Sequence, residues 1–251
     1  MTTLDRQLVL RFVSTEIVEF HKSRSEVLRK VSLDKVLLKK NPYLFRAKNL
    51  TLASDLVAAI MQAFLSSSEE EQFGEFLEEL AIFVSEQTCG GKKSSAQGID
   101  LEFDRDGTRY LLAIKSGPNW GNSSQYRRLE QDFENALKLQ RQSGRAPQLQ
   151  AVLGICYGKR KPTAKGVYRI YAGQSFWHFL SGDENLYVDI VEPIGHEAKR
   201  HNDDFEEQRA AVQNQLTMEF LQRFCNPDGR IEWARFVAFN SGNLPAAGAK
   251  E

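Results

Sequence analysis

Apolar residues recur along this chain with two periods, and the change of period marks the expected elements. Helical spacing predicts helices in five segments: residues 10–20, 52–64, 73–83, 127–142 and 205–225. Strict alternation of apolar and acidic residues at 99–104 predicts a strand with one buried face. The apolar run LQAVLGICYG at 149–158 predicts a strand buried on both faces. The pattern indicates an α/β (α+β) fold with a mixed central sheet of about four to six strands flanked by helices.

Breaks in the pattern predict how the chain divides. The run Ser66-Ser67-Ser68 interrupts the helical spacing, and Ser68 with Glu71 fits a capping box that starts a new helix. We therefore expect a helical N-terminal region at residues 1–66. The remaining residues, 67–251, contain all the expected strands and form the second region.

Composition narrows the class of protein. The 251 residues carry 33 Lys and Arg against 33 Asp and Glu, so the net charge is zero and a globally basic nucleic-acid binder is excluded. No apolar run reaches the roughly 18–20 residues of a membrane span. The cysteines at 89, 156 and 225 form no CxxC pair, the histidines show no zinc spacing, and no glycine-rich nucleotide motif occurs. We expect a cytoplasmic globular protein.

The strand at 99–104 continues into a hairpin with predictable register. Asp106-Gly107 is a favoured two-residue turn, so paired positions sum to 213. Opposed residues share a face of the sheet, which predicts two sets. One face carries Asp100, Glu102, Ala113 and Lys115, and the other carries Ile99, Leu101, Leu112 and Ile114. Lys115 then lies diagonally from Asp100, roughly 7–8 Å away before the side chains turn toward each other.

An acid and a lysine that converge on adjacent strands suit phosphodiester hydrolysis. A carboxylate holds Mg²⁺, which prefers oxygen ligands and acidifies a bound water. A lysine ammonium orients or deprotonates the attacking water, or stabilises the charged transition state. The alternative is a polar sheet face whose Asp100 and Lys115 form only a surface pair.

The string GIDLEFDRDGTRYLLAIKSGPNWGNSSQ, residues 98–125, resembles the core of the PD-(D/E)XK nucleases. Its segment IKSGPNWGNSSQ is similar to the PmeII-like type II restriction endonucleases, and further similarity extends in order over most of residues 36–242. The resemblance implies a sequence-specific endonuclease that uses Mg²⁺ and cuts double-stranded DNA as a homodimer at a short, roughly palindromic site. It gives Asp100 the metal-binding role and Lys115 the catalytic role, and it implies a cognate DNA methyltransferase that shares the site.

Ala113 departs from the superfamily pattern, in which an acid beside the lysine supplies a second metal ligand. The acid has been replaced by Glu102 on the same face, or by Glu79 or Glu86 of the preceding helix, or it has been lost and the protein cuts poorly. We favour Glu86, which is nearest the loop into the hairpin. The expected metal ligands are Asp100, Glu86, Glu102 and Ile114. A repair or junction-cleaving nuclease of the same fold and a non-catalytic DNA-binding protein stay open as alternatives.

DNA contacts are expected from loops around this hairpin. The loop after Lys115 leads into a helix start, where small residues and free N–H groups favour phosphate. The loop at 157–169 contains five cations and no acid, and it is our first choice for a phosphate or groove contact. The alternative for each loop is ordinary surface. The candidates are Lys92, Lys93, Asn119, Asn122, Ser123, Gln125, Lys159, Arg160, Lys161 and Lys165. We expect the helical region 1–66 to support the dimer.

Overall fold

A six-stranded mixed sheet and ten helices make up the described part of the computed structural model, residues 2–142 and 148–243. The strands are β1 (Lys92–Lys93), β2 (Leu101–Arg105), β3 (Thr108–Lys115), β4 (Gln148–Ile155), β5 (Thr163–Lys165) and β6 (Tyr168–Ala172). The helices are α1 (Arg6–Arg29), α2 (Leu33–Leu38), α3 (Pro42–Ala47), α4 (Ala53–Cys89), α5 (Ser123–Gln142), α6 (Gln174–Ser181), α7 (Leu186–Asp189), α8 (Val191–Ile194), α9 (Ala198–Phe224) and α10 (Trp233–Ser241). The sheet order is β1-β2-β3-β4-β6-β5, with β3, β4 and β6 parallel, which confirms the predicted fold class.

The chain forms two compact units. Unit 1 comprises Met1–Phe20 and Gln72–His196, and unit 2 comprises His21–Glu71 and Glu197–Glu251. Helices α1 and α4 each contribute to both units. Unit 1 contains every strand. Unit 2 is helical in its described residues, and the division of the chain at residues 66 and 67 stays a prediction about dimerisation and catalysis. No helix of the described residues is long and apolar enough to cross a membrane.

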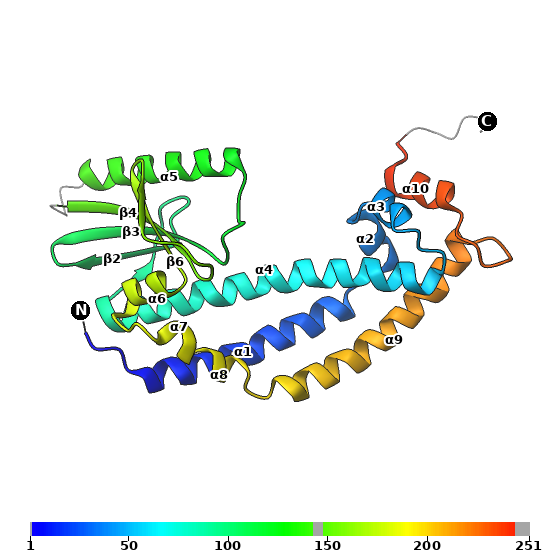
Figure 1. Ribbon diagram of the computed structural model, residues 1–251, viewed down its shortest axis with the longest axis horizontal. Helices are drawn as coiled ribbons and strands as arrows, with labels where there is room; N and C mark the ends of the chain where they lie inside the picture. Colours follow the sequence, from blue (N-terminus) through cyan, green and yellow to red (C-terminus); the bar gives the residue numbers. More distant parts are fainter. Residues whose placement is uncertain (1, 143–147, 244–251) are drawn as a thin grey trace. The chain divides into compact units, whose positions relative to one another are not determined.

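In unit 1 the sheet is covered on both faces (Figure 1). Helix α5 packs through Leu129 and Phe133 on the face that carries Leu111 and Ala113. The unit-1 part of α4, with α6, packs on the face that carries Leu101, Leu112 and Ile114. Strand β4 lies between β3 and β6 and is buried on both faces, as its continuous apolar run predicts.

The hairpin of β2 and β3 has the predicted register. Arg105 pairs with Thr108, Asp104 with Arg109 and Glu102 with Leu111. Asp106 and Gly107 both have positive φ, 51° and 75°, as a type I′ turn requires.

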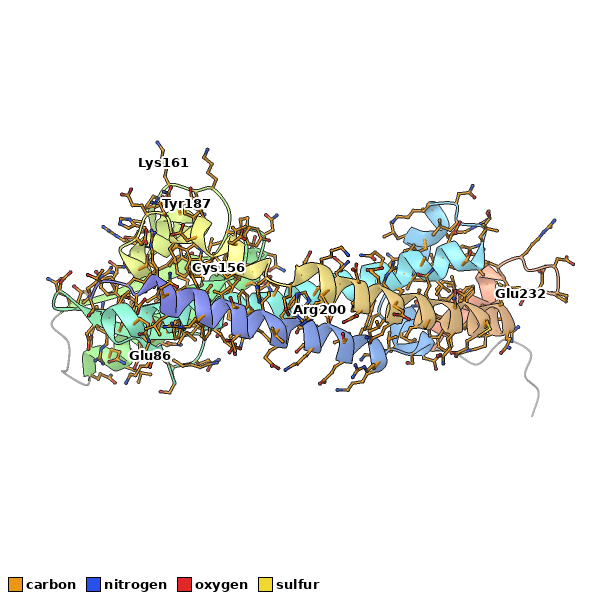
Figure 2. The ribbon with its side chains drawn as sticks, turned by 90° about the horizontal axis from the view of Figure 1, so that it is seen from below. Glu86, Cys156, Lys161, Tyr187, Arg200 and Glu232 are labelled. Carbon is orange, nitrogen blue, oxygen red and sulfur yellow. The ribbon has the colours of Figure 1, made fainter. Side chains whose placement is uncertain are left out.

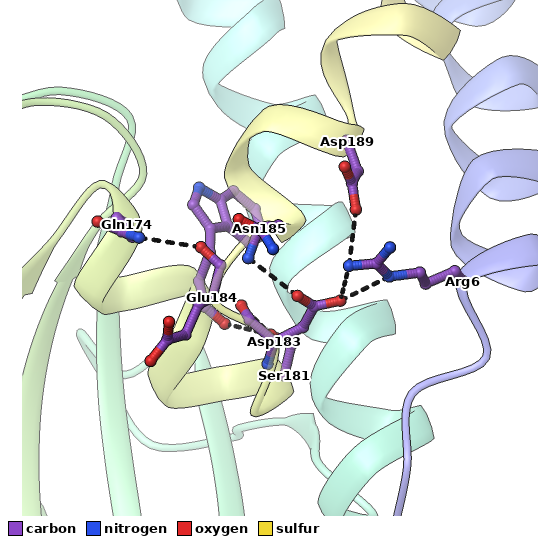
Figure 3. A network of polar contacts seen from close by, with 8 residues as sticks. Arg6, Gln174, Ser181, Asp183, Glu184, Asn185 and Asp189 are labelled. Carbon is purple, nitrogen blue, oxygen red and sulfur yellow. Dashed lines mark hydrogen bonds and ion pairs between the residues drawn. The ribbon is translucent and has the colours of Figure 1, made fainter.

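The start of α1 is attached to unit 1 by a polar network (Figure 3). The Arg6 guanidinium donates from Nε to Asp183 Oδ2 at 2.7 Å and lies 3.0 Å from Asp189 Oδ2. The Asn185 N–H, bonded to the Asp183 carboxylate, and Arg6 together lower the pKa of Asp183. These contacts connect α1 to the loop between α6 and α7 and to the end of α7.

Unit 2 has its own apolar core. Phe220 and Phe224 of α9 and Phe236 of α10 pack on residues of α2, α3 and the first part of α4. The Asn240 side-chain amide donates to the Leu37 carbonyl at 2.7 Å, which links α10 to the end of α2.

Several local predictions were wrong. Helix α4 runs without a break through Ser66–Ser68, because Ser67 Oγ donates to the Ala63 carbonyl at 3.0 Å and is accommodated inside the helix. The expected loops at 88–98 and 157–169 contain the short strands β1 and β5, which pair with β2 and β6 at the sheet edges.

Candidate active site

The predicted acid and lysine meet at one end of the sheet. Lys115 is the last residue of β3, at the edge where the parallel strands β3, β4 and β6 all end and where open α/β sheets bind ligands. Lys115 Nζ lies 3.9 Å from Asp100 Oδ2. The two side chains are 33% and 23% exposed, so both reach solvent and neither is buried in hydrocarbon.

Asp100 lies where the alternation of the strand breaks. Leu101 packs in the α4 core as predicted, but Ile99 packs with Ala113 in the α5 core, so the prediction that Ile99 shares the face of Leu101 was wrong. The ladder is irregular here: Asp100 Oδ2 accepts the Ile114 N–H at 2.6 Å, where a regular ladder would use a main-chain carbonyl, and the Asp100 N–H donates to the Leu112 carbonyl at 2.8 Å. The N–H and C=O of a strand residue face the same neighbour, so the Ile114 carbonyl also lies on the Asp100 side.

Glu78 of α4 joins this pair, and the sequence analysis missed it. Its Oε1 lies 3.9 Å from Lys93 Nζ, and Lys93 pairs in the sheet with Leu101, the neighbour of Asp100. Burial raises the pKa of Glu78, the Asp100 charge raises it further, and Lys93 and Lys115 oppose the shift.

A sequence signal for Glu78 existed. Gly74, Glu78, Ala81 and Ile82 follow one line of helix α4, so the glutamate lies among small and apolar residues. Glu79, by contrast, lies on the exposed side of the helix.

Buried Cys156 follows the last residue of β4, beside Lys115. Its N–H donates to the Lys115 carbonyl at 2.9 Å, and its own carbonyl accepts from Trp177 Nε1 at 2.9 Å. Burial raises the pKa of the Cys156 thiol well above its usual value, with the Glu78 charge adding to the shift and Lys115 opposing it. Glu78 and Lys115 therefore lie within electrostatic range of one buried atom.

The other two predicted acids, Glu102 and Glu86, differ in their surroundings. Glu102 Oε1 is 3.2 Å from Lys92 Nζ, and Glu102 Oε2 accepts from Ser94 Oγ at 3.4 Å. Glu86 is exposed, two turns beyond Glu78 on α4. In the described ranges, no three His, Cys, Asp or Glu side chains gather as a metal site.

The groups near Lys115 nevertheless suit Mg²⁺. They are oxygen donors only: the carboxylates of Asp100 and Glu78 and the main-chain carbonyl of Ile114. Mg²⁺ is bound in this way by one or two carboxylates, with waters and substrate phosphates completing its shell.

The loop after Lys115 packs tightly around the lysine. The Trp120 ring centroid lies 5.8 Å from Lys115 Nζ and 4.5 Å from the Tyr126 ring. A Cβ on Gly117 would lie 2.2 Å from Tyr157 Oη, so this backbone contacts the tyrosine because it has no side chain. Glycine at 117 thus lets the loop close against the end of β4.

A family model described as type II restriction endonuclease EcoO109I matches residues 7–202, which is well over half of the chain and includes this site. The chain belongs to the type II restriction endonuclease EcoO109I family. No curated protein matches the chain significantly. Membership makes the protein a nuclease, a hydrolase that acts on DNA. The match supports the restriction endonuclease membership that the resemblance implies, and it does not single out the PmeII-like enzymes.

For a restriction endonuclease of this family, the helix start after Lys115 is a candidate DNA contact. Asn122 Oδ1 accepts the N–H groups of Ser124 and Gln125 at 3.0 and 3.2 Å, and Gln125 Oε1 accepts the Asn122 N–H at 2.8 Å. Asn122 and Gln125 therefore form a capping box for α5, a structural role beside the predicted DNA contact. Asn119 and Ser123 are exposed.

The predicted basic loop is also at the surface. Lys159, Arg160 and Lys161 are exposed and line one wall of a cavity of about 780 Å³, and Lys161 extends away from the body of unit 1 (Figure 2). Lys165 is on β5, and its Nζ lies 4.6 Å from the Tyr126 ring centroid. Lys92 and Lys93 are exposed on the edge strand β1, where they pair with Glu102 and Glu78.

Proposed function

We propose that this protein makes metal-dependent, sequence-specific double-strand cuts in DNA at a short, roughly palindromic site. The observation that carries the proposal is the 3.9 Å approach of Lys115 Nζ to Asp100 Oδ2 at the carboxyl edge of the sheet, in a chain of a restriction endonuclease family. The resemblance of IKSGPNWGNSSQ to PmeII-like enzymes supports the same activity.

Each residue at this edge has a defined task in the proposed reaction. Asp100 holds Mg²⁺ through the carboxylate, with the Ile114 carbonyl as a further oxygen donor. When bound, the metal acidifies a water and neutralises charge on the phosphate. Lys115 donates hydrogen bonds to the attacking water or the phosphate and stabilises the negative charge that develops there. Trp120 covers the lysine, which keeps its ammonium group near Asp100.

DNA is held by the exposed cations and polar groups around the edge. Lys159, Arg160 and Lys161 contact phosphates or a groove, with Lys165 beside them. Lys92 and Lys93 contact the backbone, and Glu102 stays with Lys92 as an orienting acid. The scissile strand contacts Asn119, Asn122, Ser123 and Gln125 at the start of α5.

Assembly follows from the proposed target. A palindromic site is matched by a two-fold protein, so we propose a homodimer supported by residues 1–66. A cognate DNA methyltransferase protects the same site in the host.

A non-catalytic DNA-binding protein is the second candidate. Ala113 favours it, because an alanine stands where the superfamily has an acid. Incubating the protein with plasmid DNA, Mg²⁺ or EDTA separates the two. Discrete fragments with one common end sequence support the endonuclease, whereas uncut but retarded DNA supports the binder. Structure-selective cutting of junctions would indicate a repair nuclease instead.

Lys115→Ala tests the assigned lysine. We expect cleavage to be abolished while specific retardation of DNA in Ca²⁺ is kept, because the substitution removes transition-state stabilisation and leaves the DNA-binding loops intact. Lys138→Ala, on an exposed position of α5, is the matched control and should cut like the wild type. Normal cutting by Lys115→Ala would remove that residue from the mechanism.

A further inference from the structure

We infer that Glu78 supplies the second metal-binding carboxylate, in place of the acid absent at Ala113. The inference rests on the proposed function and adds one residue to its site. Ala113 is 1% exposed and lies in the α5 core with Phe133 and Leu153. A charged carboxylate at position 113 would be desolvated in this apolar environment, which is costly. The acid has to reach the metal from another element.

Helix α4 places Glu78 at the correct end of the sheet. A Cβ on Gly74 would lie 3.5 Å from the Cβ of Ser116, the residue that follows Lys115, so this turn of α4 passes over the end of β3. Glu78 lies one turn further along the same side of the helix. Its contact with Lys93, opposite Leu101, places it beside the start of β2, where Asp100 lies.

Glu78 differs from the other acids in the unit-1 part of helix α4 by its burial, and from Glu102 by its partner. Its side chain is 29% exposed, whereas Glu75, Glu79 and Glu86 on the same helix are all exposed. Glu102 is paired with Lys92 on the edge strand. Glu78 is partly buried, and the charges of Asp100 and Lys115 both act on it.

Lys93 is the group that a metal ion would displace. At 3.9 Å, with Lys93 73% exposed, the Lys93–Glu78 contact is a loose ion pair that contributes little by itself. Asp100 and Glu78 would hold a divalent ion through their carboxylates, and Glu78 would then no longer need Lys93, whose ammonium could contact the DNA backbone. On this inference, metal binding and the predicted phosphate contact of Lys93 are connected through Glu78.

Binding of Mn²⁺ to the full-length protein without DNA tests the assignment, measured by the loss of the free-ion electron paramagnetic resonance signal. Glu78→Gln should weaken Mn²⁺ binding by about tenfold or more, and Asp100→Asn should do the same. Glu79→Gln, the adjacent exposed position, is the matched control and should bind like the wild type. Circular dichroism of each variant shows that the fold is kept.

A double-variant cycle gives a second readout that does not depend on loss of function. Lys93→Gln should tighten Mn²⁺ binding by about two- to fivefold, because the competing ammonium is gone. In the Glu78→Gln background the same change should have little effect. Equal tightening in both backgrounds would overturn the assignment of Glu78.

The outcomes separate this inference from the proposed function. Normal Mn²⁺ binding by Glu78→Gln, with loss in Asp100→Asn, would overturn Glu78 and leave the nuclease proposal intact. If Glu86→Gln lost Mn²⁺ binding and Glu78→Gln did not, the second metal-binding carboxylate would be assigned to Glu86. A wild-type protein that cuts no DNA with Mg²⁺ contradicts the proposed function, whatever Glu78 binds.

Discussion

Gly154 of β4 lies under a buried aromatic ring, and an alanine there should disrupt the layer that supports the catalytic strand. Gly154 pairs with Ile114, the residue before Lys115. A Cβ on Gly154 would lie 2.2 Å from Phe176 Cε2 and 2.7 Å from Cδ2. Phe176 is fully buried, so its ring has no exposed rotamer to adopt. The substitution must therefore move α6 away from the sheet.

The expected cost follows from two opposed effects. Overpacking of a tight core costs about 1–3 kcal/mol, and the 2.2 Å contact argues for the upper part of that range. Replacing glycine by alanine reduces the entropy of the unfolded chain, which returns about 0.4–1 kcal/mol. We expect Gly154→Ala to lower the free energy of unfolding of unit 1 by about 2 kcal/mol.

Urea unfolding followed by circular dichroism measures this loss. Gly74→Ala is the matched control: its Cβ meets Ser116 at an ordinary 3.5 Å within a helix, so the same substitution should stabilise by about 0.5–1 kcal/mol. Phe176→Leu removes ring atoms, and the double variant Gly154→Ala/Phe176→Leu should lose less stability than the two single losses combined. Wild-type stability of Gly154→Ala would refute the packing argument.

Three further predictions concern other parts of the chain. Asn122→Ala should cost about 1 kcal/mol of stability by thermal unfolding because the α5 cap is lost, whereas Asn122→Asp should keep the cap. The pKa of His21 is lowered to about 4, first by burial and then by His201 and Arg24, so between pH 6.5 and about 4 the unfolded chain binds a proton that the folded chain does not bind. The free energy of unfolding should therefore fall by about 1–2 kcal/mol as the pH drops from 6.5 to about 4, after allowance for partial exposure. His21→Gln should reduce this pH dependence of stability. Lys159→Gln/Lys161→Gln should weaken DNA binding and reduce the slope of log affinity against log salt by about two, and an unchanged slope would remove this loop from the phosphate contacts.

The hairpin could be predicted because its determinants are local. The turn Asp106-Gly107 and the period-2 pattern fix the register of β2 and β3 completely. The meeting of Asp100 and Lys115 follows from that register. The continuity of α4 could not be predicted in the same way, because a run of three serines is compatible both with a break between two helices and with the interior of one helix. The hydrogen bond from Ser67 Oγ to the Ala63 carbonyl, which decides between them, is visible only in the structure.

The position of the proposed second carboxylate depends on how helix α4 packs on the sheet, and the local pattern alone does not determine that packing. Glu78 and Glu79 are adjacent in the sequence, and only the structure, which shows the face of α4 that packs toward β3, reveals that Glu78 is partly buried and Glu79 is exposed. Gly74 was the available cue, because a glycine within a helix indicates a close approach by another element. The nearness of Glu86 to the hairpin along the chain does not by itself bring its side chain to the site, because Glu86 is exposed and lies two turns beyond Glu78 on α4.

One hydrogen bond of Asp100 belongs both to the sheet and to the proposed active site. Its Oδ2 accepts the Ile114 N–H at 2.6 Å and so replaces a rung of the ladder, which fixes the carboxylate beside the residue that precedes Lys115. The regular pairing of β2 and β3 ends at the same place, and Ile99 packs on the other face of the sheet. A carboxylate held by backbone keeps its position whether or not a cation is present, so the geometry of the acid and the lysine is set before DNA arrives. The break in alternation that made the local prediction fail is thus the feature that organises the proposed site.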